Sequence, residues 1–389
     1  MREKLRRLSA LGPTRPATRP RVPPPSGEGE GVEVIRARFS LAHRHGSGAL
    51  GEYFGAIDEH DGCDPAQTLW LDTETTGLAG GTGTYVFLVG LASLQGASLV
   101  VEQILLRRLS AEGRFLTGLQ ERLARTRHLV TFNGQRFDWP MLEARFILNR
   151  LRGVTVDVHT DLIHTARRLW HRVLGTHRLG ALETEILGAP REGDIPGWEI
   201  PGLYVHYLRT AERGALEPVL AHNRADLLAL IGLHAAVAQV LRDPSGSHRP
   251  IDWEGAGVLL ARRGKPRQAV SCFERALGTP QDFRDRWRIL RRCVRQYRLL
   301  GETERVHERW EQERLAWRAP DRYRARLLLE VTRARERAGD RAGALAAAAE
   351  ALHATLESQG HGISRPPDLV ALLRRKIERL AGRPIHQEA

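Results

Sequence analysis

The run LWLDTETTG contains two acids, Asp72 and Glu74, whose type and spacing could bind a metal ion. They are two residues apart, so on a strand both side chains project from the same face. An apolar strand that ends in two such acids is costly to fold unless a cation compensates the charges. Oxygen ligands of this kind suit Mg²⁺ and Mn²⁺. The alternative is a strand end whose acids are solvated, and the pair alone does not exclude it.

Two further acids, Asp138 and Asp226, have equally ordinary alternatives. Asp138 lies in LVTFNGQRFDWPMLEARF, where a strand and a turn lead to a helix with Pro140 in its first turn. Asp is common as the N-cap before such a proline, so Asp138 alone predicts a helix cap. Asp226 follows His222 by four residues in LAHNRADLLALIGL, so both share one face of a helix. A buried His–Asp pair of this kind is more often structural than catalytic.

Four acids in this order and context nevertheless form a known signature. The sequence resembles the DEDD superfamily of 3′–5′ exonucleases, whose three motifs correspond here to DTETTGL, NGQRFDWPML and HNRAD. More narrowly, it is similar to the YprB-type ribonuclease H-like family over about residues 33–240. The longer runs that carry this similarity are LDTETTGLAGGTGTYVFLVGLA, LVTFNGQRFDWPMLEARF, HTDLIHTARRLW and GDIPGWEIPGLYVHYLRT.

The resemblance implies metal-dependent, 3′–5′ exonuclease-type hydrolysis of nucleic-acid phosphodiester bonds. The implied ligands of two Mg²⁺ or Mn²⁺ ions are Asp72, Glu74, Asp138 and Asp226. Two such ions can stabilise both the attacking and the leaving oxygen. His222 would accept a proton from the attacking water, a role suited to imidazole near neutral pH. One main subtype has His five residues before the last Asp, and the other has Tyr four before it. This chain has His at the Tyr spacing, which leaves the identity of the general base open.

Other residues near these motifs are candidates for substrate contact. The glycine-rich segment GLAGGTGTY lies between two strands and no helix follows it, so it predicts a hairpin turn rather than a dinucleotide site. The backbone from Thr75 to Gly77 could still touch the terminal nucleotide, because glycine permits close approach. The candidate substrate-binding residues are Thr75, Thr76, Gly77, Asn133 and Trp198.

The segment GDIPGWEIPGLYVHY places three aromatic rings close to Arg191 and Arg209. Aromatic rings interleaved with arginine can stack on bases and bind phosphate. The alternative is packing in the core, which we expect for Tyr204 and Tyr207. For Trp198 the sequence favours neither stacking on a base nor packing against the protein.

Charged residues outside the motifs are expected to have structural or solvent-facing roles. Asp157 and Asp161 in VDVHTDLIH could support the metal site from behind its ligands, but Asp161 is better explained as the cap of the following helix. The arginine pairs at 167–168, 262–263 and 291–292 are expected to be mostly solvated helix faces, and each is only a weak candidate for contact with a phosphate backbone.

The elements that must position these residues follow from the hydrophobic pattern. We expect strands at VEVIRARF, 68–74, 84–94 and 98–106, and the last three form an antiparallel meander. Helices near 111–125, 139–151 and 215–242 then alternate with short strands, at 128–132 and in TVDVHTD. This order describes an α/β fold in which helices flank a mixed sheet. With the resemblance, it predicts a ribonuclease H-like domain over residues 33–242.

After a break at 242–252 the chain becomes helical and repetitive. Gly264, Gly301 and Gly339 lie 37 and 38 residues apart, and mostly small or apolar residues recur five, nine and twelve positions after each. Such positions let two antiparallel helices approach closely. The pattern resembles the tetratricopeptide repeat, so we expect an all-α helical-repeat domain at 251–358. A C-terminal helix and tail would follow at 359–389, and the repeats could bind a protein partner.

Composition limits the class of protein further. The chain has 389 residues, enough for two domains with hydrophobic cores. Residues 1–32 are basic and rich in Pro and Gly, which predicts a disordered tail. The net charge of +13 fits a polyanionic partner, although nearly every basic residue is Arg and coding bias could explain part of it. Three widely spaced cysteines fit a reducing compartment. We find no run of eighteen apolar residues and no secretory signal, so we expect a cytoplasmic protein that crosses no membrane.

Three functions are compatible with these patterns. The first is an active exonuclease that acts on the 3′ end of DNA or RNA. The second is a non-catalytic nucleic-acid-binding protein, and the third is a repeat-based adaptor with an ancillary nuclease domain. The complete set of four acids favours the first, because an unused cluster should decay. The first and third functions can coexist.

Overall fold

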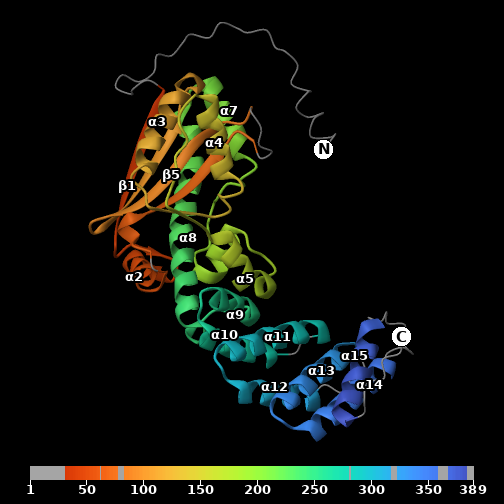
Figure 1. The fold of residues 1–389 in the computed structure, drawn as a ribbon. Coiled ribbons are helices and arrows are strands. Elements are labelled where there is room, and N and C mark those ends of the chain that lie inside the picture. The colour runs from red at the N-terminus through yellow and green to blue at the C-terminus, as the bar shows by residue number, and fades with distance from the viewer. Residues whose placement is uncertain are drawn as a thin grey trace.

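The computed structural model describes residues 31–61, 63–77, 83–279, 282–316, 322–357 and 367–382. A sheet-bearing part lies at one end of the molecule and a helical part at the other (Figure 1). The predicted N-terminal tail lies outside the described residues except for its last two positions. The tip of the glycine-rich turn, 78–82, and the C-terminal residues 383–389 also lie outside them.

A six-stranded mixed sheet forms the centre of the first part. Its strands in spatial order are β1 (Val32–Ser40), β6 (Ser98–Leu106), β5 (Val86–Gln95), β4 (Thr68–Thr75), β7 (His128–Thr131) and β8 (Val158–Asp161). The first four pair antiparallel and contain the predicted meander, whereas β7 and β8 add in parallel beside β4. The predicted mixed α/β sheet is therefore confirmed.

Helices cover both faces of this sheet (Figure 1). One face carries α3 (Glu112–Leu123), α4 (Asp138–Leu148) and α7 (Ile200–Thr210), and the other carries α2 (Leu50–Asp61) and α8 (Glu217–Arg242). Each face has its own hydrophobic core, filled by strand residues and by these helices. The sequence pattern predicts neither α2 nor α7.

Strand β4 divides the two cores because its side chains alternate. Leu69 and Leu71 belong to the core under α3 and α4, whereas Trp70 belongs to the core under α2 and α8. Asp72 and Glu74 continue the row that begins with Trp70. The two acids therefore face the side of the sheet that α8 covers.

α8 is the longest helix among the described residues, and it joins the two parts of the molecule. The stretch Arg213–Arg242 is long and apolar enough to cross a membrane by composition, but 72% of its most apolar window is buried inside the protein. Its far end packs against α5 (Leu162–Leu174) and α9 (Trp253–Arg262) in one continuous core. Burial of this kind is typical of a central helix in a protein core.

The helical part consists of hairpins. After α9 come α10 (Pro266–Leu277), α11 (Phe283–Leu299), α12 (Thr303–Ala316), α13 (Arg322–Arg337), α14 (Arg341–Glu357) and α15 (Pro367–Ala381). Gly264, Gly301 and Gly339 form the turns of three hairpins with φ of 70°, 73° and 79°. The residues at the predicted offsets are all buried: Ala269, Phe273, Ala276, Val306, Trp310, Glu313, Ala344, Ala348 and Ala351.

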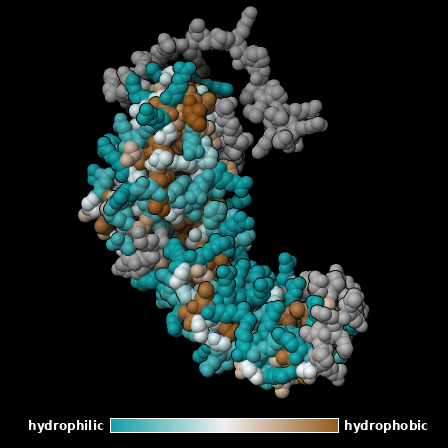
Figure 2. All heavy atoms as spheres, viewed as in Figure 1, coloured by the Kyte–Doolittle hydropathy of each residue, from teal (hydrophilic) through white to brown (hydrophobic). Residues whose placement is uncertain are grey.

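The predicted helical hairpins are thus confirmed, while the tetratricopeptide assignment and the domain limits stay predictions. Hydrophilic side chains cover most of the visible face of both parts, with apolar ones scattered among them (Figure 2). All three cysteines are buried and none forms a disulfide.

Candidate metal centre

Asp72 is held by the helix that crosses the sheet beside it. Asn223 of α8 donates a hydrogen bond from Nδ2 to Asp72 Oδ2 at 2.8 Å, and its Oδ1 accepts one from Gln103 Nε2 at 2.9 Å. Gly90 pairs with Asp72 across β4 and β5, and a Cβ at Gly90 would lie 2.2 Å from Asn223 Oδ1. The glycine of VFLVGLA is therefore needed so that Asn223 can reach the strand.

α8 also brings His222 and Asp226 to Glu74. The ligand atoms of these three residues all lie within 4.8 Å of one another. His222 Nδ1 lies 2.7 Å from Asp194 Oδ1, and His222 Nε2 lies 3.4 Å from Asp226 Oδ2. The shared helical face predicted for His222 and Asp226 is confirmed. Asp194 is a partner that the sequence did not indicate.

Asp138 reaches the same centre from the start of α4. It occupies the first turn of that helix, and Phe137 is the residue at the N-cap. The Asp138 side chain accepts a hydrogen bond from Thr73 Oγ1, and Thr73 lies between Asp72 and Glu74 in β4. The interpretation of Asp138 as a helix cap is therefore wrong.

Asp161 has the structural role that the sequence favoured. Its Oδ1 accepts hydrogen bonds from the backbone nitrogens of Asn133 at 2.6 Å and Ile163 at 3.1 Å. Its Oδ2 accepts another from the backbone nitrogen of Gln135 at 3.1 Å. Asp161 thus caps α5 and also fixes the turn that leads to Asp138. Asn133 has a φ of 68°, in the left-handed region that asparagine tolerates.

The four acids are partly buried and crowded, which favours their protonated forms. Burial raises the pKa of Asp72 and the pKa of Glu74 well above their ordinary values, and the charge of Asp226 raises both further. Burial also raises the pKa of Asp138 to about 6. The pKa of Asp226 is raised by burial even though Arg191 lies beside it. Without a bound cation, these surroundings therefore do not compensate the charges of all four acids.

This set of donors fits a divalent metal ion. Carboxylate oxygens are the ligands that hard divalent cations prefer. A bound cation would also replace the repulsion among the acids with attraction. Among the described residues, Glu74, His222 and Asp226 form a group whose ligand atoms are close enough to share one ion.

Arg191 belongs to this centre, and the sequence reasoning did not find that role. Its guanidinium lies 2.5 Å from Asp226 Oδ1, 2.5 Å from Glu183 Oε2 and 3.1 Å from Asp194 Oδ2. Glu183 begins a π-helical turn and is almost fully buried. Burial opposes the charge of Arg191, but Asp226 and Glu183 outweigh burial and raise its pKa. No local pattern could reveal the ion pair with Asp226, because the two residues are 35 positions apart.

Two candidate substrate-contact residues, Thr75 and Thr76, are tied into the end of β4. Thr75 Oγ1 donates a hydrogen bond to Gly77 O at 2.9 Å, and Thr76 Oγ1 accepts one from Tyr85 N at 2.9 Å. The pairing of β4 with β5 shifts register at the step into Thr75, as at a β-bulge. The hydroxyls therefore shape this turn. Contact with a substrate stays a prediction for these residues and for Asn133.

The aromatic residues of α7 and of the segment before it separate into two groups. Tyr204 stacks on Phe87 with ring centroids 3.9 Å apart, and it donates a hydrogen bond to Leu106 O at 2.7 Å. Tyr207 is buried as well, so both tyrosines are core residues, as expected. Trp198 is 68% exposed, and its ring is therefore accessible to a ligand.

Comparison with known proteins defines the class. The family model described as the RNase_H superfamily matches residues 69–238, which include all four acids, His222 and Arg191. The sheet, its flanking helices and this match define a ribonuclease H-like protein of a nuclease superfamily.

Similarity to individual proteins narrows this class. The Bacillus subtilis (strain 168) protein YprB is 32% identical over 278 residues, which cover 67% of this chain and 67% of YprB. The chain belongs to the YprB family of ribonuclease H-like proteins. The family B DNA polymerase of the hyperthermophilic archaeon Pyrobaculum calidifontis is similar over 55% of this chain and 29% of its own, with a TM-score of 0.38 and 15% identity. This chain thus spans less than a third of that polymerase, and so low a similarity supports no statement about function.

Proposed function

We propose that this protein is a metal-dependent 3′–5′ exonuclease that hydrolyses phosphodiester bonds of DNA or RNA by a two-metal mechanism. The observation that supports this most directly is that Glu74, Asp138 and Asp226 lie close enough for their charges to raise the pKa of Asp72, with Glu74 and Asp226 beside His222. Four partly buried carboxylates with so little compensation are costly for the fold, so a structural role alone does not explain them. Membership of a ribonuclease H-like family supports the same reaction class.

The four carboxylates would hold two Mg²⁺ or Mn²⁺ ions. When bound, the ions supply the positive charge that stabilises the attacking and leaving oxygens of the phosphodiester. Arg191 would have a positioning role, because its hydrogen bond of 2.5 Å to Asp226 Oδ1 fixes the direction of that carboxylate. Asn223 fixes Asp72 in the same way.

His222 is the proposed general base. Its Nδ1 lies 2.7 Å from Asp194 Oδ1, so this hydrogen bond places the ring hydrogen on Nδ1 and leaves Nε2 to accept a proton. Once protonated, Nε2 would be stabilised by Asp226, whose Oδ2 is 3.4 Å away. Asp194 would therefore orient the base without touching the substrate.

Substrate contact is assigned to residues around this centre. The exposed ring of Trp198 would stack on a base near the 3′ end. The backbone from Thr75 to Gly77, together with Asn133, would contact the terminal nucleotide. We also propose a cytoplasmic location and a protein partner for the helical part.

An assay with labelled strands tests the proposal. Single-stranded DNA and RNA with a 5′ label are incubated with the full-length protein in Mn²⁺ or in EDTA. We expect a ladder of progressively shorter labelled products that requires Mn²⁺ and is abolished by Asp72→Asn. The matched control is Asp157→Asn, which removes an exposed acid 3.6 Å from Arg127 and should leave the ladder unchanged.

The same assay separates the exonuclease from its alternatives. Cleavage of a circular strand would show an endonuclease, and binding without metal-dependent cleavage would show a non-catalytic binder. Either result contradicts the proposal.

The role of His222 is tested through Asp194→Asn. We expect this change to lower kcat about 10- to 100-fold with KM nearly unchanged, and to shift the pH profile of kcat. If Asp194 only stabilised the fold, the melting temperature would fall and the pH profile would keep its shape.

A further inference from the structure

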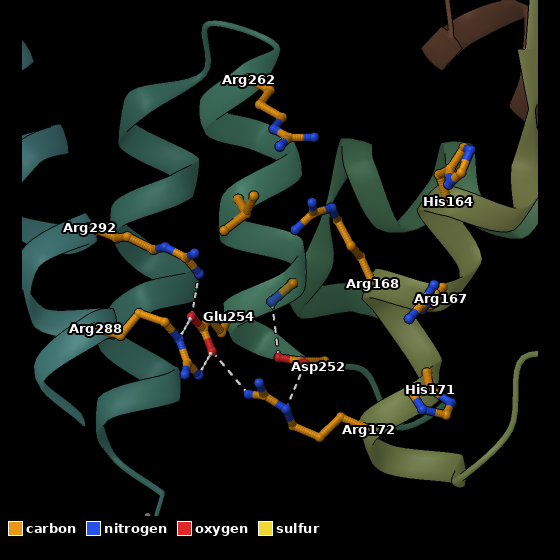
Figure 3. Close-up of a pocket in the computed structure, with 12 residues that line it drawn as sticks. His164, Arg167, Arg168, His171, Arg172, Asp252, Glu254, Arg262, Arg288 and Arg292 are labelled. Carbon is orange, nitrogen blue, oxygen red and sulfur yellow. Dashed lines mark hydrogen bonds and ion pairs between the residues drawn. The ribbon is translucent and has the colours of Figure 1, made fainter. Parts of the chain in front are cut away.

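An arginine-lined cleft lies where the sheet-bearing part meets the helical part (Figure 3). Its volume is about 680 Å³, and α5, α9 and α11 supply its walls. Its arginines are Arg167, Arg168, Arg172, Arg262, Arg288 and Arg292. Two carboxylates line it, Asp252 and Glu254, and Asp285 pairs with Arg288 from just outside the lining, so the six arginines exceed these three carboxylates by three charges. Arginine pairs that the sequence predicts as separate solvated faces thus contribute to one concave surface.

A single buried carboxylate organises half of these arginines. Glu254 is 4% exposed and accepts hydrogen bonds from Arg172 at 2.9 Å, from Arg288 at 2.6 Å and from Arg292. Burial raises the pKa of Glu254, but the hydrogen bonds from Arg288 and Arg172 outweigh burial and lower it. Glu254 therefore fixes three guanidinium groups in place, and Asp252 and Asp285 add ion pairs to Arg172 and Arg288, so the uncompensated charge of the cleft comes from its other arginines.

The other half of these arginines is unpaired. Arg167, Arg168 and Arg262 form no ion pair or side-chain hydrogen bond with any residue that the structure describes. Figure 3 shows Arg168 and Arg262 directed into the space between α5 and α9. Burial lowers the pKa of Arg292, and the charges of Arg288 and Arg168 lower it further against the effect of Glu254. A bound anion would relieve this crowding of like charges.

The basic surface continues along α11. A second concavity of about 560 Å³ shares Arg288 and Arg292 with the cleft. Its other arginines from the same helix are Arg284, Arg291, Arg295 and Arg298, and Glu330 in the lining pairs with Arg298 at 3.2 Å. Positions 284, 288, 291, 295 and 298 are three or four residues apart, so they share one face of α11. An extended row of cations suits a polymer of regularly spaced phosphates better than a small anion.

Helix α5 connects the cleft to the candidate metal centre. It begins directly after Asp161, whose side chain fixes the turn before Asp138. Arg167 and Arg168 line the cleft, and they lie six and seven residues after Asp161, about 10 Å along the helix axis. About three nucleotides of a stacked strand cover that distance.

We propose that the cleft and the arginine face of α11 bind the sugar–phosphate backbone of a nucleic-acid strand, beginning about three nucleotides from the 3′ end that enters the metal centre. The placement of the 3′ end rests on the proposed function, whereas the binding itself does not. Arginine suits this ligand because its planar guanidinium can donate two parallel hydrogen bonds to one phosphate. A concave surface fits a strand better than it fits a flat lipid layer.

The test removes the three unpaired arginines from the full-length protein. The cleft variant carries Arg167→Gln, Arg168→Gln and Arg262→Gln. A control variant with the same loss of charge carries Arg38→Gln, Arg125→Gln and Arg152→Gln, at exposed positions in β1 and after α3 and α4. Both variants should keep the melting temperature of the parent, because neither set forms a side-chain ion pair within the described residues. A third variant with lysine at the three cleft positions keeps the charge.

Binding is measured in EDTA, so that the result does not depend on hydrolysis. The probe is a 5′-labelled single strand of roughly 25 nucleotides, followed by fluorescence anisotropy over a range of salt concentrations. We expect the cleft variant to bind about tenfold more weakly or worse. The slope of log K against log salt should fall by about 2, because three phosphate contacts to a single strand contribute about 0.7 each. The control variant should change much less, and the lysine variant should recover most of the affinity.

Substrate length provides the second measurement. In Mn²⁺, the cleft variant should raise KM for the long strand but not for one of about two nucleotides, which cannot reach the cleft. Equal weakening by the cleft and control variants would overturn the inference. The inference would also be overturned if the cleft variant lost binding to anionic lipid vesicles but kept its binding to nucleic acid. If binding depends on the cleft but no strand is hydrolysed, the proposed function fails and the binding inference stands.

Discussion

Removing the charge of Asp138 should stabilise the metal-free protein at neutral pH. Burial among other acids raises the pKa of Asp138 from 3.8 to about 6. A shift of about two units corresponds to about 3 kcal/mol of unfavourable free energy for the charged form in the folded state. Asp138→Asn removes this cost, and the amide Oδ1 can still accept the hydrogen bond from Thr73.

The sign of this effect depends on pH. Because the pKa is higher in the folded protein than in the unfolded chain, protonation of Asp138 favours folding. That contribution is fully present below about pH 4 and is lost as the pH rises to about 6 and beyond. The variant should therefore match the parent near pH 4 and exceed it by up to about 3 kcal/mol at pH 7. For a cooperative unit of about 200 residues, this amounts to a rise of roughly 6 to 12 °C in melting temperature.

Thermal unfolding in EDTA at several pH values measures this effect, with Asp157→Asn as the control for the loss of an exposed acid. Added Mn²⁺ should stabilise the parent more than the variant, because the parent keeps the complete set of carboxylates. The reasoning is refuted if Asp138→Asn lowers the melting temperature at pH 7 in EDTA. It is also refuted if the gain at pH 4 equals the gain at pH 7.

Three other changes have defined outcomes. Gly90→Ala should destabilise the protein by about 2 to 4 kcal/mol in urea unfolding, since the new Cβ displaces Asn223 from its two hydrogen bonds; a cost below about 1 kcal/mol would contradict this account. Arg191→Gln leaves buried acids without their cation and should cost about 3 to 5 kcal/mol in EDTA, and Mn²⁺ should restore more stability than it adds to the parent. Gly301→Ala should cost about 1 kcal/mol because its φ is 73°, whereas Gly202→Ala within α7 should stabilise slightly; equal effects in thermal unfolding would rule out the backbone explanation.

Features that depend on local pattern could be predicted from the sequence. The alternation in β4 places Asp72 and Glu74 on one face, and the four-residue spacing places His222 and Asp226 together, since helices and strands have fixed periods. The hairpin glycines and the buried positions after them follow from the same kind of regularity. The predicted cap role of Asp161 also needs only the chain next to it, because Ile163 N lies two residues away.

Features that depend on pairing between distant segments could not be predicted in this way. The ion pairs of Arg191 with Glu183 and Asp226, and the contact of Asp194 with His222, depend on how a loop returns to α8. Asp138 shows the same limit, because its position before a proline favours a cap in isolation. Only the folded sheet brings Thr73 and the other acids to it and reveals its place in the centre.

The burial of α8 restricts which insertions this helix can accept. Each residue of an α-helix advances 1.5 Å and turns by 100°. One residue inserted between Asp226 and Leu233 would therefore rotate Leu233 and Val237 out of the core that they share with α5 and α9. Only insertions close to a whole number of turns, such as about seven residues, would keep the residues at both ends of α8 facing their present cores. The position of the candidate metal-binding end of α8 relative to the core that it shares with α5 and α9 is thus fixed by the helix itself.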